Sequence, residues 1–471
     1  MRIAVVGAGG FVGRALVAEL VSRGHEVVAV SRHQTAVTGA SARAVDVGDE
    51  AGLGDALDGC EAAYYLVHSL GAGDFRRRDL QLAAGFGRAA AAAGVRRIVY
   101  LGGLGDHPGS DHLASRQEVG VALGDAGVPV VELRAAVILG AGSMPFEMLR
   151  YLTERLPMMV CPRWVRTAIQ PISLGDALAY LVQSLDVAPG VYEIGGADVT
   201  SYRELIATYA RVRGLRRRFI VDIPYLTPRL SSYWVNLVTP VDQAVSHVLI
   251  ESLTVEVVVQ RQQETAAAFG IEAVESRAAI EAALDAQARG VDAQLLTLEP
   301  GLVDGIYTAR ADAPIAADAI QRADADLEDI GGSYGWYGFA WAWRLRAGLG
   351  RLVGEPWYLC RPAVVEPGAR VDWWTVARRQ PSKLVLRAQD WCFGEGWLGF
   401  EIRTAQVAVV AAARPRGIPG FLYWKLLEPF HGRIFERLAR HRAARAERSS
   451  RTFASEFSPR EPGAKGLPPP A

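Results

Sequence analysis

Residues 2–13, Arg-Ile-Ala-Val-Val-Gly-Ala-Gly-Gly-Phe-Val-Gly, decide the fold of the first part of this chain. Ile3–Val6 is a continuous apolar run, as expected of a strand that is buried on both faces of a parallel sheet. Glycines then recur three residues apart, at Gly7, Gly10 and Gly13. A helical pattern follows over residues 12–22. A strand, a glycine turn and a helix in this order predict the start of a doubly wound α/β domain.

The same alternation of strand and helix continues to about residue 140. Short apolar runs predict strands at Arg2–Val6, Glu26–Ser31, Ala42–Val47, Ala62–Val67, Arg97–Leu101 and Val128–Leu133. Helical patterns lie between them at Val12–Ser22, Glu50–Leu57, Arg77–Ala93 and His112–Asp125. Strands separated by helices form βαβ units with right-handed crossovers. The sequence therefore predicts a Rossmann fold, a doubly wound parallel sheet, over residues 1–140.

The rest of the chain predicts further parts. Residues 141–275 are rich in proline and predict a small α+β lobe, and 276–300 predict a helical linker. A C-terminal domain over 301–447 holds nine of the eleven tryptophans. Its apolar runs predict antiparallel strands at Val371–Val376, Lys383–Gln389, Trp397–Arg403 and Ala405–Ala412, then a long helix over 420–445. Residues 448–471 predict a disordered tail.

Composition narrows the classes of function. The 471 residues contain 51 Lys plus Arg and 51 Asp plus Glu, so no net charge attracts nucleic acid. Four widely spaced cysteines predict neither a disulfide framework nor a metal site, and favour a reducing, cytoplasmic location. The N-terminus lacks a signal-peptide pattern, and no apolar run is long enough to span a bilayer. Nothing in the sequence predicts the oligomeric state.

The glycine loop predicts a dinucleotide site. Such a loop needs glycine for a tight turn, for close approach of the pyrophosphate and for close helix packing, and its free N–H groups face the phosphates. The loop residues expected to contact the cofactor are Gly7, Gly9, Gly10, Phe11, Val12 and Gly13. The second strand ends in Ser31-Arg32 without the acid that usually binds an NAD ribose. Because Arg32 can pair with a 2′-phosphate, NADP(H) is favoured and NAD(H) is the alternative. A solvated loop arginine is the competing interpretation.

These features resemble the extended and atypical short-chain dehydrogenases/reductases. The likeness rests on the glycine spacing, on Asp46-Val47 and on Gln170-Pro171-Ile172 with Asp176. It implies Asp46 and Val47 near the adenine, and it implies contacts along the cofactor from Leu66, Val67, His68, Arg134, Ala135 and Ala136. The segments 64–69, 115–120, 162–166, 230–232 and 237–240 are similar to one bacterial family. In that family, such a module precedes a domain of unknown function similar to the START-like helix-grip group.

The usual catalytic set of these dehydrogenases is missing. They use a Tyr-x-x-x-Lys pair on the helix after the fifth strand and a hydroxyl at the end of that strand. Here the strand ends in Gly102-Gly103, and His112 and Arg116 have the Tyr and Lys spacing. An imidazole titrates near neutral pH, so His112 is a candidate proton donor, whereas Arg116 can only position a ligand. His68 is a second candidate. The alternative interpretation is that neither takes part in proton transfer: His112 is then a polar residue in the first turn of its helix, and His68 only lines the edge of the cofactor.

Two functions therefore compete. An oxidoreductase acting on a bulky apolar small molecule agrees with the cofactor site, and the aromatic C-terminal domain could hold that molecule. A non-catalytic NADP(H)-binding sensor or scaffold agrees with the missing catalytic set. The C-terminal helix is basic, with Arg433, Arg437, Arg440, Arg442 and Arg445. A closing core helix with a solvated face is favoured there over peripheral membrane contact.

Overall fold

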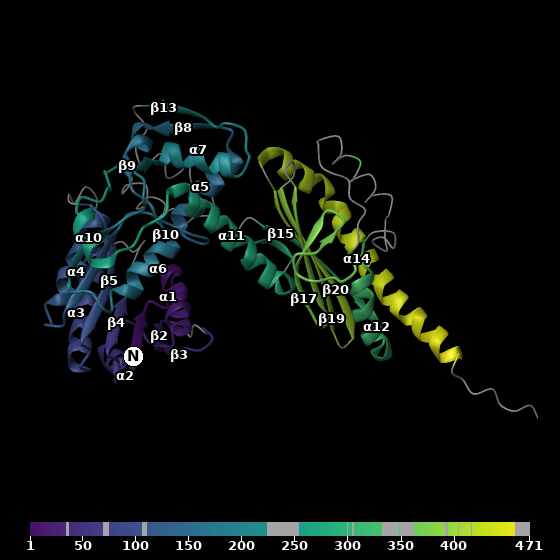
Figure 1. Cartoon of the computed structure of the whole chain (residues 1–471), viewed down its shortest axis with the longest axis horizontal. Coiled ribbons are helices and arrows are strands. Elements are labelled where there is room, and N and C mark those ends of the chain that lie inside the picture. Colours follow the sequence, from purple (N-terminus) through teal and green to yellow (C-terminus); the bar gives the residue numbers. More distant parts are fainter. Residues whose placement is uncertain are drawn as a thin grey trace, which may run out of the picture. The chain divides into compact units, whose positions relative to one another are not determined.

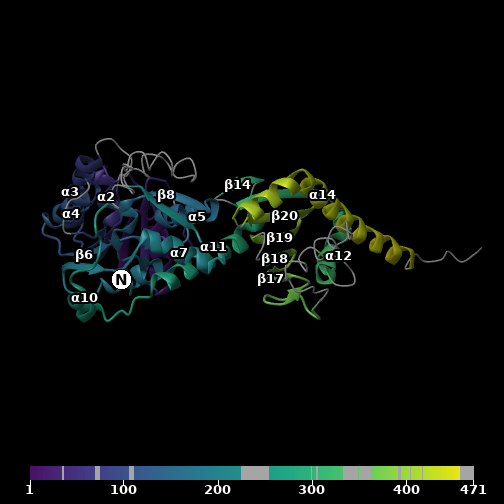
Figure 2. The same cartoon turned by 90° about the horizontal axis from the view of Figure 1, so that it is seen from above.

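The structure is a computed structural model of the whole chain (Figure 1). It describes residues 1–33, 37–68, 75–105, 111–223, 254–298, 300–303, 306–331, 348, 362–390, 394–403, 405–415 and 417–456. The chain divides into two compact units, Met1–Gln287 and Ala288–Ala471. The helix that the sequence predicts as a linker runs across this division. It is α11 (Ser276–Gln294), drawn in Figures 1 and 2.

The N-terminal unit is built on a seven-stranded parallel sheet in the order β11-β6-β5-β4-β1-β2-β3. Its strands are β1 (Arg2–Val6), β2 (Glu26–Ser31), β3 (Ser41–Ala44), β4 (Ala62–Tyr65), β5 (Arg97–Gly103), β6 (Val130–Ala135) and β11 (Gly190–Ile194). The predicted doubly wound parallel sheet is confirmed. The last strand, β11, comes from the region that the sequence predicts as a separate lobe.

Helices cover both faces of this sheet. On one face, α1 (Phe11–Ser22) and α6 (Leu174–Gln183) bury Leu16 and Leu181. On the other face, α2 (Glu50–Leu57), α3 (Phe75–Ala92) and α4 (Asp111–Gly124) bury Leu53, Phe86 and Leu123. This two-sided burial explains why the strands are continuous apolar runs.

Several strand ends differ from the prediction: β5 and β6 run two residues further, to Gly103 and Ala135, and two other strands end earlier. The strand predicted over Ala42–Val47 is β3 (Ser41–Ala44), and the strand predicted over Ala62–Val67 is β4 (Ala62–Tyr65). The register with the neighbouring strands ends at Ala44 and Tyr65, and single hydrogen bonds continue from the N–H groups of Val45 and Leu66 to the carbonyls of Ser31 and Val6. The residues expected along the cofactor, Asp46-Val47 and Leu66–His68, therefore lie in loops after the strands.

A smaller layer completes the first unit. It contains α5 (Met144–Arg155), α7 (Tyr202–Val212), the 3₁₀ turn η1 (Arg163–Arg166) and a parallel two-stranded ribbon of β8 (Met158–Pro162) and β13 (Phe219–Ile223). The helix α10 (Gln262–Phe269) instead packs on the large sheet, with Phe269 against Tyr180 and Tyr192. Short pairs join β7 (Ile138–Leu139) to β10 (Ile172–Ser173), and β9 (Ala168–Ile169) to β12 (Thr200–Ser201). Its core packs Phe146 and Leu149 of α5 against Leu205 and Tyr209 of α7. Buried charge is paired, since Glu154 accepts from Tyr209 at 2.6 Å and from Arg213 at 3.3 Å.

The C-terminal unit contains a seven-stranded antiparallel sheet in the order β14-β15-β20-β19-β18-β17-β16. The strands are β14 (Gly301–Val303), β15 (Ile306–Pro314), β16 (Arg370–Val371), β17 (Trp374–Gln380), β18 (Lys383–Asp390), β19 (Gly394–Arg403) and β20 (Gln406–Pro415). The predicted antiparallel sheet followed by a long helix is confirmed. The single strand predicted at Val371–Val376 is wrong: Asp372 has a left-handed backbone (φ 54°) and turns the chain between β16 and β17. The strands β14 and β15 were not predicted.

The long helix α14 (Gly417–Glu456) packs on this sheet together with short helical turns. These are η2 (Leu295–Thr297), η3 (Ala317–Ala319), α12 (Ile320–Ala325) and η4 (Asp326–Asp329). Two of its arginines face inward: Arg442 is buried over the ring of Phe400, and Arg445 pairs with Asp326 and Asp329 at 3.3 and 3.1 Å. The helix continues to Glu456, into the segment predicted to be a disordered tail. In the described part of the chain, no helix is long and apolar enough to cross a membrane.

Candidate functional site

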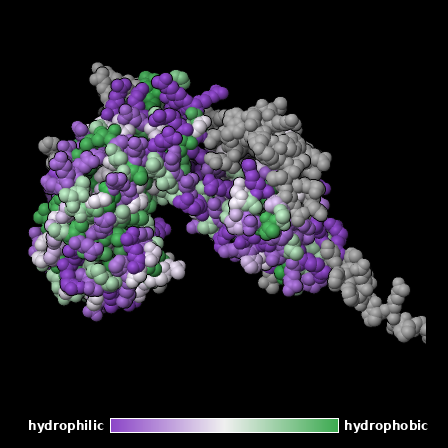
Figure 3. All heavy atoms as spheres, in the orientation of Figure 1, coloured by the Kyte–Doolittle hydropathy of each residue, from purple (hydrophilic) through white to green (hydrophobic). Residues whose placement is uncertain are grey.

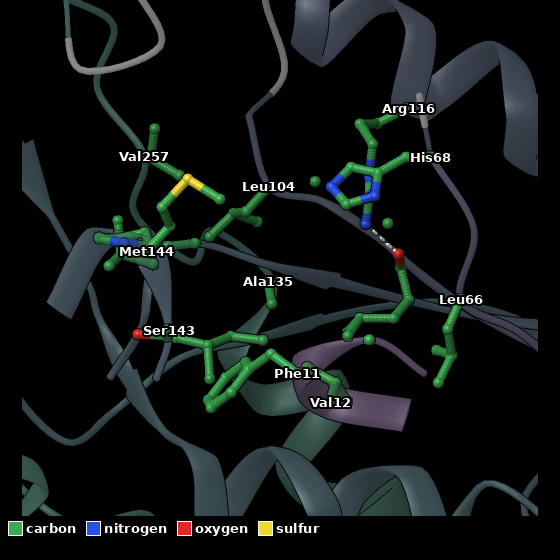
Figure 4. Close-up of a pocket in the computed structure, with 18 of the residues that line it drawn as sticks. Phe11, Val12, Leu66, His68, Leu104, Arg116, Ala135, Ser143, Met144 and Val257 are labelled. Atoms are coloured by element: carbon green, nitrogen blue, oxygen red, sulfur yellow. Dashed lines mark hydrogen bonds between the residues drawn. The ribbon is translucent and has the colours of Figure 1, made fainter. Parts of the chain in front are cut away.

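A cavity of about 410 Å³ opens at the carboxyl ends of the parallel strands in the N-terminal unit (Figure 4). It lies next to the boundary between β1 and β4, where the order of the strands reverses. Ligands of open α/β sheets bind at such a switch point. Its walls come from the glycine loop after β1, from the loop after β4 and from the ends of β5 and β6.

The glycine loop is held by contacts that only glycine permits. The N–H groups of Gly7 and Ala8 both donate to the carbonyl of Val30, at 3.0 and 3.1 Å. Gly7 has a φ of 97°, and a Cβ there would lie 2.8 Å from the carbonyl oxygen of Leu66. A Cβ on Gly13 would lie 2.2 Å from the carbonyl oxygen of Gly7. These two glycines are therefore required by the fold itself.

Gly10 differs from its neighbours. It is the N-cap of α1, it has an extended backbone, and no side chain caps the first N–H groups of the helix. A Cβ on Gly10 would meet the chain only at the carbonyl of Gly7, 3.3 Å away. Together with Phe11 and Val12, Gly10 lines the cavity, whereas Gly9 does not. The space in front of the helix is thus open, as the pyrophosphate of a dinucleotide requires.

The residues expected at the adenosine end lie outside the cavity lining. Ser31 ends β2, and its hydroxyl donates to the carbonyl of His33 at 2.6 Å, while Arg32 is exposed. The carboxylate of Asp46 accepts from the N–H of Gly48 at 2.8 Å and is exposed. Val47 is buried in the core below. The Arg32 side chain is therefore accessible to a ligand.

The predicted contacts along the cofactor divide into two groups. Leu66, His68 and Ala135 line the cavity, and Figure 4 shows them around it with Phe11. Val67 instead packs against the core. Arg134 donates to the buried carboxylate of Glu132 at 2.8 Å and does not belong to the lining.

Arg116 of α4 lines the cavity from the β5 side. Its guanidinium donates to the carbonyl of Leu101 (dashed in Figure 4) and lies 5.6 Å from the ring centre of Tyr100. The Tyr100 hydroxyl in turn donates to the carbonyl of Arg116 at 2.8 Å, and burial raises the pKa of this phenol to about 12. Tyr100 is therefore a neutral support, and the arginine is held at one place in the cavity wall.

The end of β5 is closely packed at the position where ordinary dehydrogenases carry a hydroxyl. A Cβ on Gly103 would lie 3.1 Å from Leu113 of α4, and a Cβ on Gly102 would lie 3.0 Å from the carboxylate of Glu132. A serine or threonine would therefore require one of these side chains to shift by a few tenths of an ångström. The side chain of His112, at the start of α4, lies outside the described residues, so its predicted role stays a prediction.

Sequence reasoning missed the apolar half of the cavity. Segments far apart in the chain supply it, with Leu104, Leu113, Val137, Ile138, Met144, Pro145, Met148, Ile169 and Val257. Tyr202, at the start of α7, is a polar member of this wall, and burial raises the pKa of its phenol. No local pattern could indicate these residues, because the fold alone brings them together.

A second, smaller cavity of about 160 Å³ lies in the C-terminal unit, between the sheet and α14. Its lining is largely aromatic, with Trp373, Trp374, Trp397, Tyr423, Trp424, His431 and Phe435. Glu395 also lines it and accepts from the buried Arg414 at 2.8 Å. About 150 Å³ of apolar space is enough for a molecule of the size of benzene.

Family comparisons agree with the first site. A parallel sheet with a glycine turn at the switch point defines a dinucleotide-binding Rossmann fold. Residues 7–125 match the family model described as NAD(P)H-binding. The N-terminal unit therefore has a Rossmann fold, and residues 7–125 of it resemble NAD(P)H-binding domains. Residues 306–438 match a family described only as a protein of unknown function, so the likeness to START-like domains stays a prediction.

Solved structures and curated proteins are similar to parts of this chain. UDP-glucose 4-epimerase from Thermotoga maritima is 14% identical with a TM-score of 0.50, and the match covers 62% of this chain and all of that one. The Bordetella bronchiseptica enzyme WbmG, in complex with NAD and UDP, is 19% identical with a TM-score of 0.48, over 61% of this chain and 94% of that one. An uncharacterized protein of Mycobacterium tuberculosis is 29% identical over 225 residues. That match spans 47% of this chain and 24% of the length of the relative.

Proposed function

We propose that this protein is an NADP(H)-dependent oxidoreductase that acts on a bulky apolar substrate. The observation that carries the proposal is the apolar cavity that begins at the glycine loop. Gly10, Phe11 and Val12 form one end of it, and Met144, Met148 and Val257 belong to its apolar wall. Its volume of about 410 Å³ lies within the roughly 300–1,000 Å³ of small-molecule sites. A substrate bound there would meet the cofactor in a largely apolar environment.

Residues of this chain would bind the ligands, orient the substrate and donate a proton to it. A bound nicotinamide cofactor supplies the hydride. Arg116, held by Leu101 and Tyr100, would orient ligand oxygens but cannot release a proton. His68 is the proton donor that we favour, because its side chain lines the cavity beside Leu66. Tyr202, whose pKa is raised by burial, would stay neutral and donate a hydrogen bond to the substrate.

In this proposal, the C-terminal unit provides a second binding site, for an apolar ligand. Its aromatic cavity of about 160 Å³ would hold an apolar ligand or part of one. Glu395, which accepts from the buried Arg414, supplies polar atoms at its edge. We therefore expect the purified protein to retain apolar small molecules, which native mass spectrometry would detect together with any nucleotide.

The preference for NADP(H) rests on Arg32. The exposed guanidinium follows β2, where a carboxylate would repel a 2′-phosphate. NADPH should bind more tightly than NADH by roughly 1.5–3 kcal/mol, as for a charge-assisted hydrogen bond. In Arg32→Ala that difference should largely disappear in isothermal titration, whereas Arg43→Ala, an exposed arginine on β3, should leave it unchanged. Equal affinities for both nucleotides in the native protein would contradict the preference.

The oxidoreductase itself is tested by hydride transfer. Oxidation of NADPH, followed at its nicotinamide absorbance, should occur with apolar ketones, aldehydes or enones from a screen. The competing function, a nucleotide-binding sensor, predicts NADPH binding without turnover. It also predicts an NADPH-dependent change in the protease sensitivity of residues 275–330. That pair of results would replace the oxidoreductase with the sensor.

A further inference from the structure

The ribbon of β8 and β13 presents one apolar face outward. The two strands are parallel, and their register pairs Met158 with Phe219 and Val160 with Val221. Residues paired in this way point to the same side of a ribbon, and alternate residues point to opposite sides. The intervening Met159 and Ile220 pack into the core of the first unit. The four other side chains therefore share the outer face.

These four side chains are exposed although they are large and apolar. The exposed fraction is 63% for Met158, 66% for Phe219, 42% for Val160 and 50% for Val221. Figure 3 shows hydrophobic surface over this ribbon, bordered by hydrophilic residues. Single exposed apolar residues are ordinary, but a contiguous group on one face indicates an interaction surface.

Arginines stand at the end of the ribbon where both strands begin. Arg155 precedes β8, and Arg216-Arg217 precede β13. The N–H of Phe219 donates to the carbonyl of Pro157 at 3.0 Å, and this bond holds the segments before the two strands together. All three arginines are exposed. Among the described residues, no ion pair involves Arg216 or Arg217. The patch is thus apolar on its face and positively charged at one end.

We propose that this β8–β13 patch is a docking surface for membranes that contain anionic lipids. Apolar side chains enter the boundary between headgroups and acyl chains, while arginines pair with the headgroup phosphates. Phe219 and Met158 would insert, and Arg216 and Arg217 would bind phosphate. The contact is peripheral and does not depend on whether the protein transfers hydride.

A second copy of the chain fits the patch less well. A two-stranded ribbon of five residues is roughly 17 Å long and 10 Å wide. Its face is far smaller than the roughly 800 Å² per partner that a stable protein interface buries. Arginines at one end would also repel their counterparts when two such faces meet in parallel. A lipid surface imposes neither limit.

Sedimentation of the full chain with lipid vesicles tests the proposal. The vesicles are phosphatidylcholine alone, or phosphatidylcholine with about one third phosphatidylglycerol to supply negative charge. Two variants alter the patch, Met158→Gln/Phe219→Gln and Arg216→Ala/Arg217→Ala. Two matched variants alter exposed residues of the same kinds on α3 and α4, Leu80→Gln/Val121→Gln and Arg77→Ala/Arg78→Ala. The thermal unfolding temperature of every variant confirms that it is folded.

The native chain should bind the anionic vesicles and not the neutral ones. Each patch variant should weaken this binding by about tenfold or more, with little change in the matched variants. Binding should also fall at high salt, where the Debye length shrinks to about 3 Å. Three results would overturn the proposal: no binding to anionic vesicles at low salt, equal losses in patch and matched variants, or a native dimer that the patch variants convert to a monomer in light scattering.

Discussion

Replacing Gly10 by valine is expected to abolish binding of the nicotinamide nucleotide while the N-terminal unit stays folded. A Cβ at this position meets only the carbonyl of Gly7, 3.3 Å away, so the chain accommodates it with a shift of a few tenths of an ångström. The added methyl groups would occupy the space in front of the first N–H groups of α1, where the pyrophosphate must approach. We expect a loss of at least about 100-fold in affinity, the scale of removing two charge-assisted hydrogen bonds. Isothermal titration with NADPH measures it.

The neighbouring Gly13 provides the control for this result. Its Cβ would lie 2.2 Å from the Gly7 carbonyl, which is backbone and cannot move aside. Gly13→Val should therefore lower the thermal unfolding temperature of the domain, whereas Gly10→Val should leave it near that of the native protein. Undiminished NADPH binding by a folded Gly10→Val protein would mean that the nucleotide binds elsewhere.

Replacing His68 by glutamine is expected to lower turnover by about 10²–10⁴-fold, the contribution of general acid–base catalysis. The affinity for NADPH should change little, because the glycine loop carries that binding. Glutamine keeps a hydrogen-bonding group of similar size but cannot release a proton at neutral pH. The measurement is kcat for NADPH oxidation with whichever carbonyl substrate the screen identifies.

His112→Gln distinguishes the two histidines named by the sequence. If His112 donates the proton, its variant should show the large loss and His68→Gln should turn over normally. His441→Gln, an exposed histidine of α14, is the matched control and should retain full turnover. Loss in the His68 variant alone supports the role that we propose for it.

The fold was predictable where burial produces a recognisable pattern of apolar residues in the sequence. Ile3–Val6 and Val27–Val30 are buried on both faces, so their apolar runs identify parallel strands. The turn at Asp372 was not predictable, because a single residue with positive φ interrupts a run that otherwise looks like one strand. The strand β15 also escaped prediction. Its sequence alternates alanines with the charged Arg310 and Asp312, and it is stabilised by pairing with β20, which lies about 100 residues later.

The candidate site was predictable only at its cofactor end. The glycine loop is local in sequence, so the spacing of its glycines is enough to indicate a nucleotide site. The apolar wall has no such signal: Met144, Tyr202 and Val257 belong to separate segments and meet only in the folded chain. Arg134 shows the opposite error, since its position beside Ala135 suggests a ligand contact. Glu132, two residues earlier on the same face of β6, binds the guanidinium instead.

The close approach of α4 and β6 to the end of β5 limits how this protein could be redesigned. Introducing serine at Gly103, with tyrosine and lysine at His112 and Arg116, would recreate the sequence pattern of an ordinary short-chain dehydrogenase. The serine Cβ would then press on Leu113 at 3.1 Å, and Gly102 offers no better place beside Glu132. A conventional active site would therefore require the Leu113 side chain to move aside by a few tenths of an ångström. Grafting experiments should begin with smaller residues at position 113.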